Sequence, residues 1–418
     1  MSAARIAVAG LIALAVAMGI GRFAFTPILP MMLHDRVVDL PAASWLASAN
    51  YIGYLSGAAA CTLQPMLWAR LGWRPVDAPA LVRTGLVGTG VLTLAMALPI
   101  DAAWAALRFA AGLASALVFV YSSGWCLAQL ANLGRASLGG LMFAGPGAGI
   151  VASGLLASAL VAADRRATDA WLLFGAAACL LTAFVWRTFR TPARVAAADG
   201  VAPLAAGAAP VAVSVAPVAR AHGRAEVATL AIAYGVSGFG YIVTATFLPV
   251  IARTALPAGS PWLDLFWPIF GAGIIVGALL ATRVRVSGDL RLVIAAAYVV
   301  QAIAIAIGVG APTTAGFAIS SFMLGAPFTA ITYFALQEVR RLRPAQIAAT
   351  TGLVTVTWSI GQAAGPPMVA LALRHASGIE VAFTRSLAIA AAMLVAGALI
   401  FLASSRIWPR QRRVPAAA

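Results

Sequence analysis

Long apolar segments follow one another along almost the whole chain, and each has about the length that crosses a bilayer. A helix needs roughly 20 consecutive apolar residues to span the hydrocarbon layer. The 418-residue sequence is 62% hydrophobic and only 10% charged, whereas a soluble chain of this length needs far more charge to cover its surface. The pattern therefore predicts an all-α membrane protein and argues against a soluble helical one.

Twelve segments are expected to form transmembrane helices. Their approximate ranges are 6–32, 43–68, 78–99, 102–127, 136–162, 168–188, 226–252, 261–282, 290–311, 313–336, 346–372 and 382–404. The long break at 189–225 is rich in Ala, Val, Pro and Gly without helical periodicity, which predicts a flexible linker. The expected domains are then an N-terminal six-helix half (1–188), this linker, a C-terminal six-helix half (226–405) and a basic tail (406–418).

The basic residues indicate the orientation of the chain. All 28 are Arg, and the net charge is +16. With the N-terminus inside, twenty Arg lie in the inner breaks, the inner ends of spans or the tail, six lie in the outer breaks or the outer ends of spans, and two lie deep within spans. This bias predicts that both termini and the linker face the cytoplasm of a bacterial inner membrane. A nucleic-acid partner is not expected, because the charge forms no basic stripe on a folded face.

The residues that usually carry enzyme chemistry are sparse. Cys61, Cys126 and Cys179 lie in apolar spans with neither metal-ligand nor disulfide spacing, so they are expected to pack as small side chains. The three His lie in loops or at span ends, and no phosphate-binding glycine motif is present. We therefore expect no enzyme activity, no metal, no cofactor and no direct use of ATP.

The two halves repeat a short pattern. Gly19-Ile-Gly-Arg22 followed by Leu29-Pro30 recurs 219 residues later as Gly238-Phe-Gly-Tyr241 followed by Leu248-Pro249. The second span of each half also carries a Gly-x3-Gly pair, a spacing that lets helices approach closely. These pairs are Gly53/Gly57 and Gly273/Gly277. The aligned patterns indicate an internal duplication.

Several motifs resemble the major facilitator superfamily. They are Arg108-Phe-Ala-Ala-Gly112 in the fourth span, Gly145-Pro146-x-x-Gly149 in the fifth, and Arg70-Leu-Gly-Trp-Arg74 after the second. More specifically, Gly19-Ile-Gly-Arg-Phe-Ala-Phe-Thr-Pro-Ile-Leu-Pro30 with Gly361-Gln-Ala-Ala-Gly-Pro366 is similar to the YbfB/YjiJ-like branch. The resemblance implies two pseudo-symmetric six-helix bundles and a transporter in which the first and fourth helices of each half line a central cavity.

Two Arg residues lie inside apolar spans, where a charge is costly unless it faces a wet cavity or has a partner. At 1.5 Å per residue, Arg22 and Arg108 reach a similar depth in the outer half of the membrane. The resemblance would bring both onto one cavity wall, where paired guanidinium groups suit a carboxylate or phosphate. The alternative is that each Arg satisfies free backbone carbonyls or a polar neighbour.

Polar and aromatic residues at similar depth are further candidates for substrate binding. They are Asn50, Tyr51, Tyr121, Tyr234, Tyr241, Trp267, Trp358 and Gln362. Tyr241 is favoured because the repeat places it opposite Arg22, and Gln362 because a buried amide needs partners. For any single aromatic residue, the alternative is packing or a place in the interfacial belt. Together these residues predict a cavity in the outer half of the membrane.

Glycine and proline residues near these positions are gating candidates, because kinks and close contacts let one half rock against the other. They are Gly19, Gly21, Pro27, Pro30, Gly145, Pro146, Gly365 and Pro366; tight packing is the alternative role. No acidic residue is expected at mid-membrane. Asp264 is the deepest candidate, either as a proton site or as an interfacial loop carboxylate.

The pattern as a whole predicts a secondary transporter that moves a small organic solute, anionic or polar, by alternating access. The runner-up is efflux of uncharged amphiphilic compounds or drugs. A transporter-like sensor or scaffold is less favoured, because neither the linker nor the tail has the size of a signalling domain. The expected partners are the solute and membrane lipid, with the protein acting as a monomer.

Overall fold

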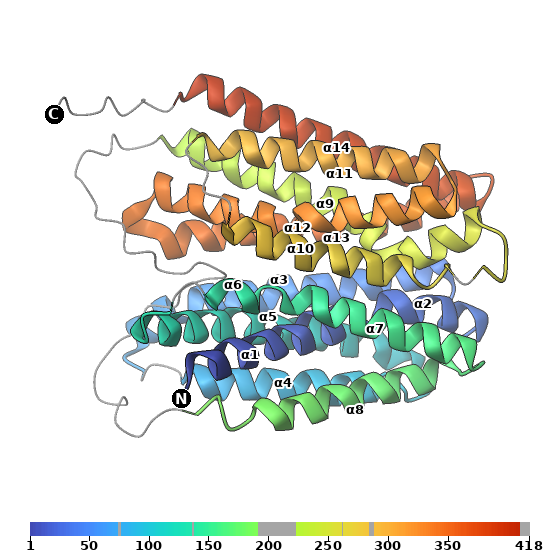
Figure 1. Cartoon of the computed structure of the whole chain (residues 1–418), viewed down its shortest axis with the longest axis horizontal. Helices are drawn as coiled ribbons and strands as arrows, with labels where there is room; N and C mark the ends of the chain where they lie inside the picture. The colour runs from blue at the N-terminus through green and yellow to red at the C-terminus, as the bar shows by residue number, and fades with distance from the viewer. Residues whose placement is uncertain (74–76, 136–137, 191–222, 261, 284–287, 410–418) are drawn as a thin grey trace.

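The computed structural model describes residues 1–73, 77–135, 138–190, 223–260, 262–283 and 288–409, and within these ranges it contains helices and no strands. The first six expected spans fold into one bundle (Figure 1). Its elements are α1 (Ala3–Leu14), the π-helix η1 (Ala15–Arg22), α2 (Phe25–His34), α3 (Leu40–Leu71), α4 (Ala78–Ala95), α5 (Asp101–Asn132), α6 (Gly139–Met142), α7 (Gly145–Ala162) and α8 (Ala167–Val185).

The second six spans form a bundle that lies alongside the first, and the helix axes of the two bundles are roughly parallel (Figure 1). Its elements are α9 (Arg224–Ala255), α10 (Phe266–Arg283), α11 (Leu290–Gly310), α12 (Thr314–Leu342), the 3-10 helix η3 (Pro344–Gln346), α13 (Ile347–His375) and α14 (Ile379–Ile407). The expected all-α fold of two six-helix bundles is thereby confirmed.

Nine helical segments of the described chain are long and apolar enough to cross a membrane, and α10 contributes a shorter apolar stretch. The start of α1 and the end of α14 lie at the same end of the bundle, which we call the terminal end (Figure 1). The predicted linker falls largely on 191–222 and the predicted tail largely on 410–418, which are outside the described residues.

The two bundles pack their helices in matching ways, as expected from an internal duplication. In the N-terminal half, α3 approaches α5 so closely that a Cβ at Gly53 would collide with the carbonyl of Phe109. In the C-terminal half, α10 approaches α12 in the same manner, and a Cβ at Gly277 would collide with the carbonyl of Ala326. The predicted Gly-x3-Gly pairs therefore lie in equivalent helix contacts, where only glycine permits the backbones to meet.

Equivalent positions of the two halves also meet each other. The Thr26 hydroxyl donates to the carbonyl of Ala245 at 3.1 Å, and these residues are separated by 219 positions, the offset of the sequence repeat. Contact between a residue and its own counterpart places an approximate two-fold axis between α2 and α9. Thr26 lies at the start of α2 (Phe25–His34) and Ala245 in the second half of α9 (Arg224–Ala255), so this contact lies beyond the middle of the bundle, on the side away from the terminal end.

Candidate functional site

A cavity lies between the two bundles and receives side chains from both. The empty space between its walls, counted together with its opening to solvent, is about 830 Å³. The lining residues are Met18, Tyr54, Phe119, Phe143 and Pro146 from the N-terminal half, and Tyr234, Ala278, Ala281, Phe328, Thr329, Thr332, Tyr333, Leu336, Thr355 and Trp358 from the C-terminal half. These positions run from the middle of the helices towards the terminal end. The described cavity thus extends from the level of Met18 and Tyr54 towards the terminal end, whereas the sequence predicted a cavity at the depth of Arg22, on the side away from the termini.

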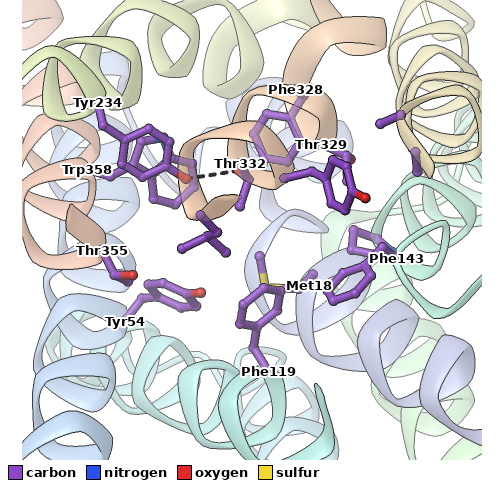
Figure 2. A pocket seen from close by; sticks show the side chains of 15 residues that line it. Met18, Tyr54, Phe119, Phe143, Tyr234, Phe328, Thr329, Thr332, Thr355 and Trp358 are labelled. Carbon is purple, nitrogen blue, oxygen red and sulfur yellow. Dashed lines mark hydrogen bonds between the residues drawn. The ribbon is translucent and has the colours of Figure 1, made fainter. Parts of the chain in front are cut away.

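The cavity wall is aromatic, with a few hydroxyl groups and no charged residue among its lining side chains. Tyr234 stacks on Trp358, with ring centroids 6.0 Å apart and 18° between the planes. The Tyr234 hydroxyl donates to Thr332 at 3.0 Å, the bond drawn in Figure 2, and so joins α9 to α12. Tyr54, Phe119 and Met18 face this group across the space from the N-terminal half (Figure 2). Such a surface suits a flat apolar body with a small number of polar atoms.

The first membrane segment departs from regular α-helix just where the cavity ends. The π-helix η1 covers Ala15–Arg22, and the chain then turns before α2 begins at Phe25. Side chains from neighbouring helices bond to carbonyls of this segment: Ser115 donates to Ala17 at 2.8 Å, and Asn50 donates to Gly21 at 3.4 Å. Short π-helical stretches occur often at functional sites, and this one carries Arg22.

Arg108 supports the same segment. Its guanidinium donates to the carbonyls of Gly21 at 3.4 Å and Arg22 at 3.2 Å, and its own carbonyl accepts from Asn50 at 2.9 Å. The side chain is buried and lies over the ring of Phe25. These contacts are of the alternative kind considered for Arg108, in which a guanidinium satisfies backbone carbonyls.

Arg22 lies directly behind the cavity wall. It is 1% exposed, and its guanidinium carbon is 3.9 Å from the ring centroid of Tyr54 and 5.6 Å from that of Trp358, two residues that line the cavity. Its Nη2 donates to the side-chain oxygen of Gln362, and the Gln362 amide donates in turn to the Tyr241 hydroxyl. Among the described residues, no ion pair links Arg22 to a carboxylate, and its Nε and Nη1 have no hydrogen-bond partner.

The structure brings some of the predicted substrate-binding residues together and separates others. Arg22, Gln362 and Tyr241 form one hydrogen-bonded chain, and Tyr234 and Trp358 lie on the cavity wall beside it. Three other candidates have contacts away from this chain: Tyr51 bonds to Thr246 at 2.9 Å, Tyr121 donates to Gln64 at 3.0 Å, and Trp267 stacks on Phe270. None of these three is among the residues that line the cavity.

The predicted gating residues lie mostly in close helix contacts. Gly19 meets the backbone of Gly149, so that a Cβ on either would collide with the other. Pro146 lines the cavity, while a Cβ at Gly145 would collide with the carbonyl of Leu11. The others lie at these places: Gly21 beside Thr89 and Ser115, Pro27 and Pro30 buried in α2, Gly365 against Ile242, and Pro366 within the continuous helix α13.

Beyond Arg22, contacts between the two bundles close the end opposite the terminal end. Besides Thr26 and Ala245, the Tyr51 hydroxyl meets that of Thr246 at 2.9 Å, and Ser48 donates to the carbonyl of Ala363 at 2.9 Å. The cavity therefore reaches Arg22 from one side, and packed helices lie on the other.

A buried charged cluster at the terminal end of the C-terminal half was not anticipated from the sequence. Arg291 contacts Glu226 at 3.2 Å and Asp289 at 2.7 Å, and Arg341 contacts Glu226 at 2.8 Å and Glu338 at 2.6 Å. Glu226 and Glu338 are both buried, and neither was singled out from the sequence. The three-residue spacing of Glu338 and Arg341 was the available signal for this cluster.

Asp264 pairs with Arg253 between the end of α9 and the start of α10, with the carboxylate side chain 18% exposed. This is the place of an interfacial loop carboxylate. Within the described residues, no group of His, Cys, Asp or Glu is arranged to hold a metal ion. Cys61 and Cys126 are buried, whereas Cys179 is exposed on α8 with its Sγ against Gly90 of α4.

Two bundles around one cavity, with matched helix contacts in each, are the architecture implied by the sequence motifs. A family model described as uncharacterised MFS-type transporter YbfB matches residues 14–402. The chain belongs to this family of MFS-type transporters. No curated protein matches the chain. The MFS-type transporter family supplies the general function, transport across a membrane, and the apolar helices make the chain a multi-pass membrane protein.

Proposed function

We propose that this MFS-type transporter is a secondary transporter that moves a small organic solute, anionic or polar, across the bacterial inner membrane by alternating access. The observation that carries the proposal is the position of Arg22. It is a buried cation without a carboxylate partner among the described residues, and it lies at the closed end of a cavity between two bundles. A charge so placed is costly unless a partner arrives during the working cycle.

The arrangement of contacts supports alternating access. The cavity extends towards the terminal end, while Thr26–Ala245 and Tyr51–Thr246 join the bundles on the other side of Arg22. Rocking of one bundle against the other would exchange the closed and accessible sides around the same residues. The Arg bias of the sequence supports a cytoplasmic location of both termini, so the cavity would face the cytoplasm in this conformation.

Transport by purified protein in proteoliposomes tests the proposal, with a radiolabelled panel of organic acids, polar neutral solutes and uncharged amphiphiles. We expect uptake of at least one acid or polar solute, and a large loss of that uptake in Arg22→Ala and Arg108→Ala. Arg374→Ala is the matched control, because Arg374 is exposed in the last turn of α13. Normal transport of every accepted solute by both Arg22→Ala and Arg108→Ala would remove the basis for an anionic solute.

Efflux of uncharged amphiphilic compounds is the second candidate, and the apolar lining of the cavity favours it. Under this alternative, uncharged amphiphiles are transported and the two Arg substitutions act only on protein stability. The panel separates the two functions, because it compares charged and uncharged solutes on the same protein preparations.

A further inference from the structure

The electrostatic state of Arg22 points to a specific ligand group. The guanidinium carries five N–H donors, yet it donates to the neutral amide oxygen of Gln362, its Nε and Nη1 have no hydrogen-bond partner, and no carboxylate of the described residues forms an ion pair with it. Around it are the rings of Tyr54, Phe23, Tyr51 and Trp358, with centroids 3.9–5.6 Å from the guanidinium carbon. Aromatic faces attract a cation but do not neutralise it. The site is therefore built for a positive charge and lacks the matching negative one.

The cavity brings that missing charge within reach of Arg22. Met18 lies one turn before Arg22 in η1 and lines the cavity, and so do Tyr54 and Trp358, which contact the guanidinium. A ligand in the cavity is thus separated from Arg22 by side chains alone. Side-chain rotation is much faster than helix movement, so the ligand group can reach the guanidinium while the bundles stay in place.

The remaining wall defines the body that carries the charge. Phe119, Phe328 and Tyr333 supply apolar and aromatic surface, and Thr329 and Thr355 supply hydroxyl groups. No acidic or basic side chain is among the lining residues, so the ligand's charge has its counterpart in Arg22 alone at this wall. A carboxylate matches a guanidinium in bidentate geometry, and a flat ring matches the stacked Tyr234 and Trp358.

Gln362 connects this site to the contact between the bundles. Arg22 belongs to the N-terminal half, whereas Gln362 lies on α13 and bonds to Tyr241 on α9, both in the C-terminal half. We propose that Arg22 binds the carboxylate of an aromatic organic acid, and that the Gln362 amide oxygen holds the place of one carboxylate oxygen until the acid arrives. Binding of the acid then breaks the Arg22–Gln362 link and loosens the closed side of the transporter.

The proposal rests on the proposed function, and it is tested by ligand binding separately from transport. The probes are 3-phenylpropionate and 3-phenylpropanamide, and phenylacetate and phenylacetamide, which differ in charge at nearly equal size. Binding to the purified full chain in detergent is measured by quenching of tryptophan fluorescence and by calorimetry. We expect each acid to bind roughly ten- to hundred-fold more tightly than its amide, the range for hydrogen bonds to a charged group.

Two substitutions at one position separate the proposed exchange from a structural role. Gln362→Glu supplies an internal carboxylate to Arg22, and we expect it to abolish acid binding while amide binding persists. Gln362→Leu removes the competing oxygen, and we expect acid binding at least as tight as in the wild type. If Gln362 were needed only for packing, both substitutions would weaken the binding of both the acid and the amide.

Three results would overturn the inference: absence of acid binding to the wild type, equal affinity for acid and amide, or unchanged acid binding in Gln362→Glu. The wild-type comparison needs no variant, so it stands even if a substitution impairs folding. Transport in proteoliposomes distinguishes the two proposals. Uptake of solutes with no preference for acids would refute the aromatic acid site and leave secondary transport intact, whereas acid binding at Arg22 without any transport would refute the proposed function.

Discussion

Replacement of Arg291 by Met is expected to be the most destabilising single change in the charged cluster. Arg291 is 2% exposed and bonds through all three of its side-chain nitrogens. It contacts Glu226 on α9 and Asp289 before α11, and it donates to the carbonyls of Ser404 at 3.0 Å and Trp408 at 2.8 Å. One side chain therefore joins α11 to α9 and α14 at the terminal end.

The expected loss in the free energy of unfolding depends on the carboxylates that stay buried when Met replaces Arg291. Removal of one partner of a buried ion pair typically costs about 3–5 kcal/mol, because the remaining charge is buried without compensation. Arg341 still pairs with Glu226 and Glu338, which limits the loss, so we expect a decrease of about 3 kcal/mol in the free energy of unfolding. Glu226→Gln removes the carboxylate instead, and the double variant should lose less than the sum of the two single losses.

The free energy of unfolding is measured in mixed micelles of increasing SDS content, followed by tryptophan fluorescence. Arg374→Met is the control, because this Arg is exposed, and surface substitutions usually change stability by less than about 0.5 kcal/mol. If Arg291→Met fell within that margin of the wild type, or if the two single losses simply added, the cluster would not be the coupled unit that its geometry indicates.

Two further predictions concern packing and movement. Gly277→Val should destabilise the protein by about 1–3 kcal/mol in the same assay, because the new side chain collides with the backbone of Ala326. Gly310→Ala is the control and should have little effect, because the space around Gly310 is open. Equal effects of the two substitutions would contradict the close contact of α10 and α12. A cysteine pair at Thr26 and Ala245, in a chain freed of its own cysteines, should be joined by a short thiol cross-linker in high yield. Addition of a transported solute should lower that yield, and an unchanged yield would argue against opening at this contact.

Much of the molecule was predictable because a bilayer restricts the backbone so strongly. In lipid, every backbone polar group must be satisfied internally, so long apolar segments become helices whatever their neighbours are. Duplication was equally visible, since the repeat at an offset of 219 reappears as the Thr26–Ala245 contact. The prominence of Arg22 was also a sequence inference, because an Arg within an apolar span demands an explanation.

Tertiary structure alone decided what surrounds each of these residues. Sequence depth placed Arg22 and Arg108 at one level but could not separate their contacts, because these depend on side chains from other helices. In the structure, Arg108 donates to the carbonyls of Gly21 and Arg22, and Arg22 donates to Gln362 of the other half. The same reason applies to the buried cluster around Glu226, whose partners lie far along the chain and meet only after four helices have packed. Apolar segment length and the glycine pattern thus determined the helices and their duplication. Long-range packing determined which charges of the described residues are paired, which lack a carboxylate partner, and on which side of Arg22 the cavity lies.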